Sequence, residues 1–306
     1  TRFVVEMVNP KLGDTILDPA CGTGGFLIDT IEYVRRNEVK TQADEKILQN
    51  SIHGVELKPL PHLLAMTNMI LHGVDTPKHL RRGDMLSQPL REYGPKDRVN
   101  VIVANPPFGG AVKDGVEKNF PAEFRTKETA DLFLVLFIHL LKPNGRCGIV
   151  LPDGSLFGEG VKTAIKKKLL EECNLHTIIR LPQGVFNPYA GVNTNLLFFE
   201  KGSPTKEVWF YELPLPEGLR QYTKGQPIQH EEFDPVRQWW NDRVPNDHAW
   251  KVSIKEIQER NYKLDFKNPK RQEAINHKEP NEILEEIQMS EQNIASQIKE
   301  LQKLLK

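Results

Sequence analysis

The stretch Asp18-Pro19-Ala20-Cys21-Gly22-Thr23-Gly24-Gly25 decides the fold. It follows a short apolar strand candidate, Thr15–Leu17, and precedes a helix that starts near Phe26. A strand, a tight glycine turn and a helix N-terminus form the generic nucleotide pocket of α/β folds, where glycines let the backbone approach a ligand. A purely structural strand-to-helix turn has the same glycines, so the glycines alone leave both interpretations open.

The spacing of the turn narrows the class of ligand. A dinucleotide fingerprint that starts at Gly22 requires glycine at the position that Leu27 occupies, and no Lys-Ser or Lys-Thr pair follows for a phosphate loop. The acidic Asp18 favours a cationic or amine-bearing ligand over a pyrophosphate. Glu56 ends the next strand candidate, where a carboxylate can accept both hydroxyls of a ribose. A strand-end Glu is often a solvated cap, but its pairing with the Asp18 turn favours binding.

Apolar, β-branched runs alternate with helix-like stretches from the glycine turn onward. This alternation predicts an α/β fold with a mostly parallel sheet and helices on both faces. Two later strand candidates with no helix between them predict an antiparallel addition at one end of the sheet. The strand candidates are Thr15–Leu17, Ile52–Glu56, Val99–Ala104, Cys147–Leu151, Thr177–Leu181, Thr194–Glu200 and Glu207–Glu212. The helix candidates are Phe26–Val34, Leu63–Leu71, Asp131–Leu141 and Val161–Leu170.

A second motif, Asn105-Pro106-Pro107-Phe108, follows the strand candidate Val99–Ala104. Asn-Pro and Pro-Pro are ordinary turn signals. Here they also stiffen the backbone at the carboxyl end of a central strand, which is where open α/β sheets bind ligands. The prolines remove two amide donors and leave carbonyl acceptors. Asn105 adds a side-chain carbonyl acceptor and Phe108 an apolar ring face.

This set of groups suits a planar aryl amine, whose lone pair is delocalised into its ring. The Asn105 side chain and the Pro106 carbonyl can accept its two N–H bonds. The nitrogen then pyramidalises, and its lone pair can attack an electrophilic methyl group while Phe108 stacks on the base. No strong general base and no metal are needed.

The bulk composition describes an ordinary globular protein. The 306 residues are 39% hydrophobic and 27% charged, with a formal net charge of 0. A neutral chain is not expected to wrap nucleic acid alone, so a partner would supply most of the contacts to nucleic acid. The separated Cys21, Cys147 and Cys173 disfavour disulfides and zinc and fit a reducing cytosol, so a cytoplasmic protein is expected. No apolar run reaches the 20 or so residues of a membrane span.

Composition predicts three regions: a catalytic domain over 1–212, a loop-rich appendage over 213–280 and an amphipathic helix over 281–306. The middle region is polar and proline-rich, and Trp239 and Trp240 are expected in its core. Because the chain begins at Thr1 inside an apolar periodic segment, we expect it to be a fragment. The final helix is expected to dock on a partner; its stripe is Ile283, Ile287, Ile294, Ile298, Leu301 and Leu305.

Other charged and imidazole groups give weaker signals. Lysines along one helix, with Arg180 nearby, are interpreted either as a solvated helix face or as contacts to DNA phosphate. The histidines show no metal-like spacing and are assigned structural roles. The lysines are Lys162, Lys166, Lys167 and Lys168, and the histidines are His53, His62, His72 and His79.

Taken together, the two motifs resemble those of the N6-adenine DNA methyltransferases. The chain is similar in particular to the modification subunit of type I restriction–modification systems. The resemblance is close over residues 1–212, and the tail matches only in general character. Supporting stretches are Asp131-Leu132-Phe133-Leu134, Gly148-Ile149-Val150-Leu151-Pro152-Asp153-Gly154, Leu181-Pro182-Gln183-Gly184-Val185-Phe186 and Gly191-Val192-Asn193-Thr194-Asn195-Leu196-Leu197-Phe198-Phe199.

The resemblance implies a Rossmann-like methyltransferase fold, with a seven-stranded sheet and one antiparallel strand. It also implies S-adenosylmethionine as cofactor, and as partners double-stranded DNA, a specificity subunit and a restriction subunit. One expected departure is that the 306 residues do not include the family's usual N-terminal helical domain. The implied cofactor residues are Asp18, Ala20, Cys21, Gly22, Thr23, Gly24 and Gly25 at the methionine, Glu56 at the ribose, and Asp84 and Met85 at the adenine; the implied catalytic residues are Asn105, Pro106, Pro107 and Phe108.

Two alternatives remain at this point. Methyltransferases that act on an RNA base or on a protein glutamine also carry Asn-Pro-Pro motifs, although the broader match over 131–199 favours DNA. A non-catalytic scaffold would keep the fold without the activity, and the intact Asp18–Gly25 and Asn105–Phe108 motifs argue against it.

Overall fold

A computed structural model describes residues 1–187 and 191–270, together with positions 288, 290, 291, 294, 297 and 298. The chain divides into two compact units, Thr1–Asn268 and Pro269–Lys306. The first unit carries all the elements discussed below. Apart from those few positions, the predicted helix 281–306 lies outside the described residues.

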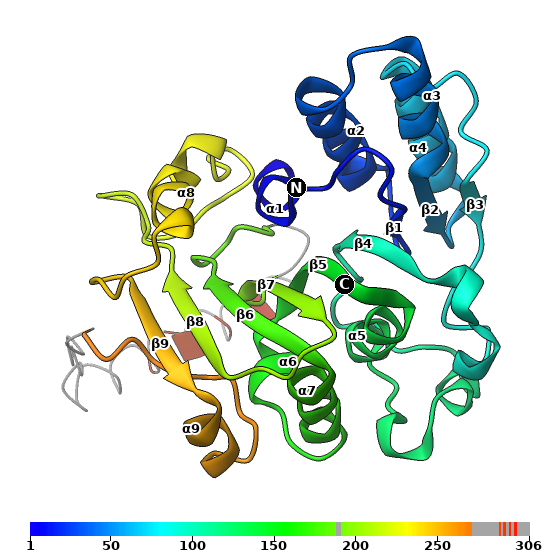
Figure 1. Cartoon of the computed structure of the whole chain (residues 1–306). Helices are drawn as coiled ribbons and strands as arrows, with labels where there is room; N and C mark the ends of the chain where they lie inside the picture. Colours follow the sequence, from blue (N-terminus) through cyan, green and yellow to red (C-terminus); the bar gives the residue numbers. More distant parts are fainter. Residues whose placement is uncertain (188–190, 271–287, 289, 292–293, 295–296, 299–306) are drawn as a thin grey trace. The chain divides into compact units, whose positions relative to one another are not determined.

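A nine-stranded sheet forms the centre of the first unit, in the order β3-β2-β1-β4-β5-β7-β6-β8-β9 (Figure 1). The strands β1, β2, β4 and β5 run parallel, with β3 parallel to β2 and β8 parallel to β6. The bounds are β1 Ile16–Asp18, β2 Ile52–Glu56, β3 Leu80–Arg82, β4 Val99–Ala104, β5 Leu141–Pro152, β6 Cys173–Arg180, β7 Thr194–Lys201, β8 Glu207–Glu212 and β9 Ala249–Ser253.

The first seven positions in this order confirm the expected mostly parallel sheet with one antiparallel strand, β7. The predicted place of that strand is wrong, because β7 pairs with both β5 and β6 and does not lie at one end. Its residues Thr194–Phe199 are buried, and such a strand needs a neighbour on each side. The sheet also has two more strands than the seven expected, since β8 and β9 extend it beyond β6.

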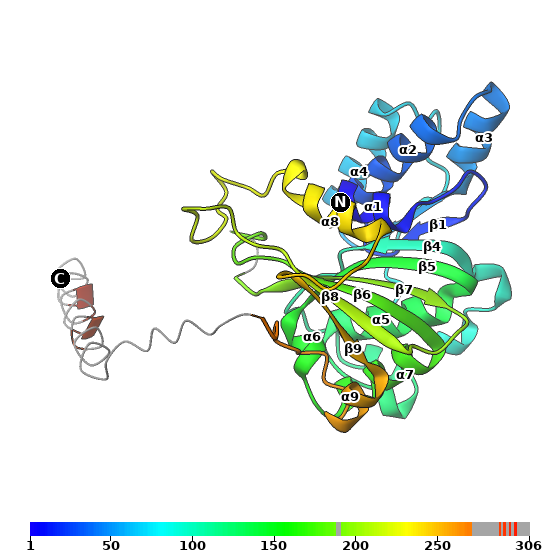
Figure 2. The same ribbon diagram turned by 60° about the vertical axis from the view of Figure 1, so that its left-hand side comes forward.

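Helices cover both faces of the sheet (Figure 2). Along β4, Val101 and Val103 belong to the core that holds α1, α2, α4 and α8, whereas Ile102 and Ala104 belong to the core under α5, α7 and α9. This alternation follows from the two-residue period of a strand. The bounds are α1 Arg2–Val8, α2 Gly25–Asn37, α3 Gln42–Ser51, α4 Pro59–Leu71, α5 Thr129–Leu140, α6 Asp153–Phe157, α7 Val161–Glu172, α8 Asp234–Asn241 and α9 Ile254–Glu259.

The strand order reverses between β1 and β4. From β1 the chain builds outward through β2 and β3, and it then returns to place β4 on the other side of β1. The helix after β1 lies on one face of the sheet, and α5, which follows β4, lies on the opposite face. In open α/β sheets this reversal leaves a crevice at the carboxyl ends of the strands. Both sequence motifs lie at this edge.

The lysines of α7 do not form a solvated, DNA-facing row. Lys166 is 2% exposed and donates to the carbonyls of Leu156 and Gly158 at 2.8 and 2.7 Å, so the hypothesis of a phosphate contact is wrong for it. Lys162 donates to the buried Asp131 carboxylate. The fold therefore uses these charges to join α7 to α5 and α6. Within the described part of the chain, no helix is both long enough and apolar enough to span a membrane.

Candidate active site

The glycine turn after β1 is tied to the neighbouring strand. The Cys21 amide donates to the Val55 carbonyl at 3.0 Å, and the Gly24 amide donates to the Cys21 carbonyl at 2.8 Å. Gly22 and Gly24 have φ angles of 56° and 88°, which residues with a Cβ atom rarely adopt. A Cβ at Gly24 would also lie 3.4 Å from the Ala65 side chain of α4. The turn therefore requires these glycines for its path.

Two carboxylates flank this turn. Asp18 is opposite Gly54 of β2 in the parallel register, and Glu56 follows two residues later. The Ala20 amide donates to Asp18 Oδ1 at 3.1 Å. The Gly22 amide donates to Glu56 Oε2 at 3.0 Å, so the predicted strand-end Glu is part of the turn and not merely a solvated cap.

The electrostatics of this pair suit a cation. Burial, followed by the nearby Glu56 charge, raises the pKa of Asp18 to about 8. Among the described residues, no Lys, Arg or His forms an ion pair with Asp18 or Glu56. Each carboxylate oxygen can accept two hydrogen bonds, so acceptor capacity remains for a ligand. A positively charged ligand would offset the unfavourable burial of the Asp18 charge.

The end of β3 adds a third acidic group at the same edge. The Gly83 amide donates to the Glu56 carbonyl at 3.0 Å, which places the following residue, Asp84, beside the Glu56 backbone. Asp84 Oδ1 accepts the Leu86 amide at 2.9 Å. Met85 is buried in the core, and its carbonyl accepts the Tyr93 hydroxyl at 2.7 Å. The structure thus brings the predicted cofactor residues together along the ends of β1, β2 and β3.

The Asn-Pro-Pro-Phe loop leaves β4, directly beside β1. Asn105 is exposed and Pro106 is buried, so the asparagine side chain is accessible at a fixed point of the backbone. The loop ends at Gly110, whose carbonyl accepts both the amide of Thr129 at 3.1 Å and its hydroxyl at 2.7 Å. These bonds anchor the loop to the first turn of α5.

An aromatic pair lies at this loop. The Phe108 ring meets the Phe186 ring edge to face, with centroids 5.4 Å apart and an angle of 82°. In the sequence analysis Phe186 appears only within a supporting stretch, and no role is predicted for it. The signal that could have found it is an aromatic residue just past the strand candidate Thr177–Leu181, on the same edge of the sheet as Asn105.

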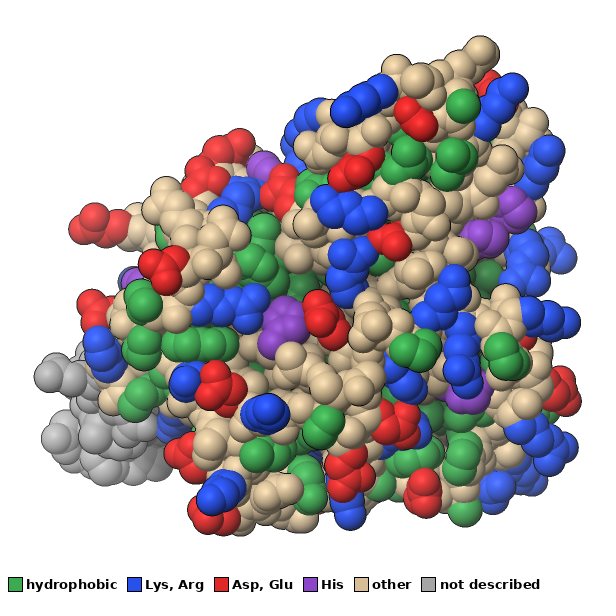
Figure 3. Space-filling model, in the orientation of Figure 1, with side chains coloured by type: hydrophobic (Ala, Val, Ile, Leu, Met, Phe, Trp, Pro, Cys, Tyr) green, Lys and Arg blue, Asp and Glu red, His purple; other side chains and the backbone are tan. Residues whose placement is uncertain are grey.

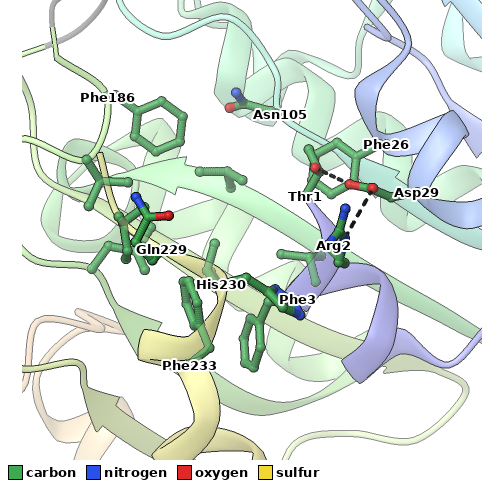
Figure 4. Close-up of a pocket in the computed structure, with 16 residues that line it drawn as sticks. Thr1, Arg2, Phe3, Phe26, Asp29, Asn105, Phe186, Gln229, His230 and Phe233 are labelled. Carbon is green, nitrogen blue, oxygen red and sulfur yellow. Dashed lines mark hydrogen bonds and ion pairs between the residues drawn. The ribbon is translucent and has the colours of Figure 1, made fainter. Parts of the chain in front are cut away.

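A cavity of about 460 Å³ opens beside Asn105 (Figure 4). Phe186 and Gln229 lie on one side of it, and Thr1 and Asp29 lie on the other. Residues from the start of α1 and from 228–233 complete the wall, and sequence reasoning assigned none of them to the site. The cavity is mostly apolar with a few polar groups, which is the usual character of small-ligand pockets.

The described residues contain no cluster of His, Cys, Asp and Glu that could hold a metal ion. The predicted structural histidines have protein contacts: His53 packs on His79 with ring centroids 4.5 Å apart, and His72 pairs with Glu32. Trp239 is buried and Trp240 half-buried, but they pack on Trp209, Tyr211 and Phe198 of the sheet, so the expectation of a separate core within 213–280 is wrong for them.

Comparisons with known sequences place this site in context. The profile of the N-6 DNA Methylase family matches residues 1–278. The methylase subunit of the type I restriction enzyme EcoEI from Escherichia coli is 54% identical over 100% of this chain and 63% of its own length. The corresponding EcoKI subunit from Escherichia coli K12 is 31% identical over 79% of this chain and 47% of its own length. The chain thus spans about six tenths of the first of these relatives.

Solved structures agree. A modification subunit of a type I restriction enzyme from Vibrio vulnificus superposes with a TM-score of 0.83 at 44% identity, covering 90% of this chain and 60% of that one. A chain from a structural study of complex assembly in the type I system superposes with a TM-score of 0.84 at 40% identity. The superposition covers 99% of this chain and 64% of that one. A class I S-adenosylmethionine-dependent methyltransferase from Listeria monocytogenes shares the fold, with a TM-score of 0.52 at 22% identity. The profile match and the identity to the EcoEI subunit show that the chain belongs to the N-6 DNA methylase family.

Proposed function

We propose that this chain is the catalytic part of a DNA methyltransferase that transfers a methyl group from S-adenosylmethionine to N6 of adenine, within the modification subunit of a type I restriction–modification complex. One observation carries the proposal. The loop Asn105–Phe108 and the Asp18–Glu56 carboxylate pair lie at the carboxyl ends of adjacent strands, on either side of the point where the strand order reverses. An amine acceptor and a cation site are thus neighbours.

The family and the fold imply S-adenosylmethionine as methyl donor, and the residues present fit it. Its sulfonium is positively charged, and the buried Asp18 carboxyl has no cationic partner among the described residues. The turn from Ala20 to Gly25 would hold the methionine part, Glu56 the ribose hydroxyls, and Asp84 with Met85 the adenine. When bound, the cofactor supplies an electrophilic methyl group.

The chain's own residues act on the target amine. The Asn105 side-chain oxygen and the Pro106 carbonyl accept the two N–H bonds of the adenine amine, which localises the nitrogen lone pair. Phe108 stacks on the base, and Phe186, which meets it edge to face, would border the same base. Because methyltransferases that act on duplex DNA extrude the target base, the base would lie beside Asn105, where the cavity lined by Asn105 and Phe186 opens.

The proposed function also implies partner molecules. The net charge of 0 disfavours tight solitary binding to double-stranded DNA on electrostatic grounds. We therefore propose that residues 1–212 carry catalysis, that 213–280 form an appendage to them, and that the helix 281–306 docks on a specificity subunit. A restriction subunit would complete the assembly.

The test is methyl transfer with tritiated S-adenosylmethionine to DNA, RNA and protein, using this chain with the neighbouring subunits of its own system. We expect label in DNA, on N6-methyladenine. Label in RNA or on a glutamine amide would support the alternative amine substrates instead. Absence of label from all three, with cofactor bound, would support a non-catalytic scaffold.

Asn105→Ala should abolish methyl transfer and leave cofactor affinity nearly unchanged, because the side chain acts on the amine and is exposed at the end of β4. Phe108→Ala should be milder, since stacking contributes roughly 1–3 kcal/mol per base. Single-turnover rates and calorimetric binding of S-adenosylmethionine measure the two effects separately. Substantial turnover by Asn105→Ala would remove the amine-polarising role.

A further inference from the structure

Helix α4 differs from its neighbours because Pro59–Leu71 contains no Asp, Glu, Lys or Arg. Its inner face packs against the first unit through Ala65 and Met69, both buried, and Ala65 lies under the glycine turn at Gly24. One face is therefore already used for the fold. Most of the other positions of α4 are apolar as well, and a helix that is apolar on several faces is normally buried on each of them.

The opposite face of α4 is exposed and apolar, at the spacing of a helix-packing seam. Leu60, Leu63, Leu64, Ile70 and Leu71 are 64%, 61%, 44%, 54% and 76% exposed. Thr67 completes the row, and its hydroxyl donates back to the Leu63 carbonyl at 3.0 Å, so that only its methyl group remains without a partner. We call these six residues the outer stripe. They repeat every three or four positions over three turns, as the residues of an interhelical seam do.

The rest of the described surface does not show such a stripe. Of the twelve large apolar side chains that are exposed among the described residues, seven lie between Ile47 and Leu71. The adjacent helix α2 has the charged Glu32, Arg35 and Arg36 among its partly or fully exposed positions. Figure 3 shows hydrophobic side chains grouped over α3 and α4, at the upper right. A contiguous apolar patch of this kind marks an interaction site, whereas single exposed leucines do not.

We infer that the outer stripe is the docking surface for a helix from the part of the polypeptide that the longer relatives have and this chain does not span. This chain matches 63% of the EcoEI subunit and 60% of the Vibrio vulnificus subunit, so more than a third of each lies outside the match and is available to cover the stripe. An uncharged stripe fits a permanent, obligate contact, because such interfaces resemble a domain core cut in half. Docking there does not depend on the reaction proposed above.

The chemistry of the stripe argues against duplex DNA, and the oligomeric state distinguishes a second copy of the chain. Duplex DNA needs donors and positive charge at its phosphates, and the stripe offers neither. A second copy of the chain would bury the stripe against itself and make the oligomeric state depend on it. A helix that carries its own row of leucines or isoleucines covers the stripe by interdigitation, as in other helix-in-groove contacts.

The experiment joins the unmatched segments of the Escherichia coli EcoEI subunit to this chain at the ends of the match, in their native order. Hydroxyl-radical footprinting then compares the oxidation of Leu63 and Leu71 in the joined protein and in the 306-residue chain. We expect at least a several-fold slower oxidation of both leucines in the joined protein. Val244, 53% exposed outside the stripe, serves as the internal reference. Equal oxidation of the two leucines in both proteins would overturn the inference.

Substitutions provide a second measurement. Leu63→Glu should leave the melting temperature of the 306-residue chain unchanged, because the side chain faces solvent there, and should lower that of the joined protein by several degrees. Val244→Glu should lower neither. If Leu63→Glu has the same effect in both proteins, the stripe is not covered by the joined segments. If light scattering shows a dimeric chain that Leu63→Glu makes monomeric, the occupant is a second copy and the inference is wrong. Methyl-transfer assays on the same proteins test the proposed function separately.

Discussion

At the residue scale, Asp18 combines two opposing requirements. Its carboxyl is 1% exposed, and one backbone amide is its hydrogen-bond donor among the described residues. Burial raises its pKa to about 8, so ionisation within the fold is unfavourable near neutral pH. The same unpaired charge is what a sulfonium would bind. Under the proposed function, the position sacrifices stability for recognition, as ligand sites often do.

The raised pKa of Asp18 predicts a pH-dependent stability. The folded pKa of about 8 lies above the ordinary value of 3.8, so the folded chain binds the proton more tightly and stability is lost as pH rises between those values. Asp18→Asn keeps the oxygen that accepts the Ala20 amide and removes the titration. We expect the variant to exceed the wild-type protein in unfolding free energy at pH 8.5 by about 1 kcal/mol or more. The gain should shrink toward pH 4. Calorimetric scans over that range measure it, and a gain independent of pH would contradict the assignment.

The same residue predicts the pH dependence of cofactor affinity. Because a cation favours the ionised carboxyl, affinity for S-adenosylmethionine should increase as pH rises toward 8 and then level off. The slope should approach about tenfold per pH unit well below that point. Asp18→Asn should bind weakly at every pH, with a loss of about 1.5–3 kcal/mol. Titration calorimetry at pH 6.5, 7.5 and 8.5 provides the measurement, and parallel profiles for the two proteins would exclude Asp18 as the group responsible.

At the scale of single elements, the sequence predicts strands well where apolar runs are long. The bounds of β2, β4 and β8 match the strand candidates. It missed β3, which has three residues, two of them exposed arginines, and β9, which lies in a polar segment. Both are held by pairing with β2 and β8 and not by their own composition. Pairing between distant segments also explains why the place of β7 could not be read from the sequence.

In the candidate site, too, local features could be predicted from the sequence and features that depend on distant segments could not. The Asp18–Gly25 and Asn105–Phe108 motifs were found because their chemistry is local. The walls formed by Phe186 and by 228–233 were missed because only the fold brings them to Asn105. The hypothesis about Lys166 failed because the sequence does not show that its ammonium group turns inward to the carbonyls of Leu156 and Gly158.

Close packing around β2 gives a prediction at this scale. A Cβ at Gly54 would lie 2.5 Å from Leu80 Cδ1 and 2.7 Å from Leu27 Cδ1, so Gly54→Ala must displace these two buried side chains. We expect a loss of about 1–3 kcal/mol in unfolding free energy. Gly83→Ala is the matched control, since its nearest neighbour would be 3.8 Å away. Urea denaturation compares the variants, and equal stabilities would show that the two leucines can move aside.

At the scale of the whole molecule, the first unit gathers three stretches that the sequence separates. The start of α1, the strand ends near Asn105 and residues 228–233 line one cavity. Glu6 of α1 accepts from Arg237 of α8 at 2.8 Å, and Phe3 stacks on Phe233 with centroids 4.4 Å apart. Residues beyond 212 thus contribute to the candidate site, even though their composition sets them apart.

Deletion of residues 281–306 tests the role proposed for the tail. The deletion falls entirely in the unit Pro269–Lys306, so the first unit should keep its melting temperature and its affinity for S-adenosylmethionine. We expect the shortened chain to lose co-purification with the specificity subunit and site-specific methylation of DNA. Unfolding of the shortened chain would show that the tail belongs to the core, and an intact complex would place the interface elsewhere.

The insertion of β7 between β5 and β6 has a consequence for synthesis on the ribosome. β5 ends at Pro152, but the strand that covers its outer edge ends only at Lys201. At a synthesis rate of about 5–20 residues per second, the edge of β5 remains unpaired for roughly 2–10 s. That edge includes Cys147–Leu151, all of them buried in the finished sheet. Open apolar edges recruit other chains, so nascent polypeptides that stall before residue 194 should aggregate more than those that stall just after residue 201.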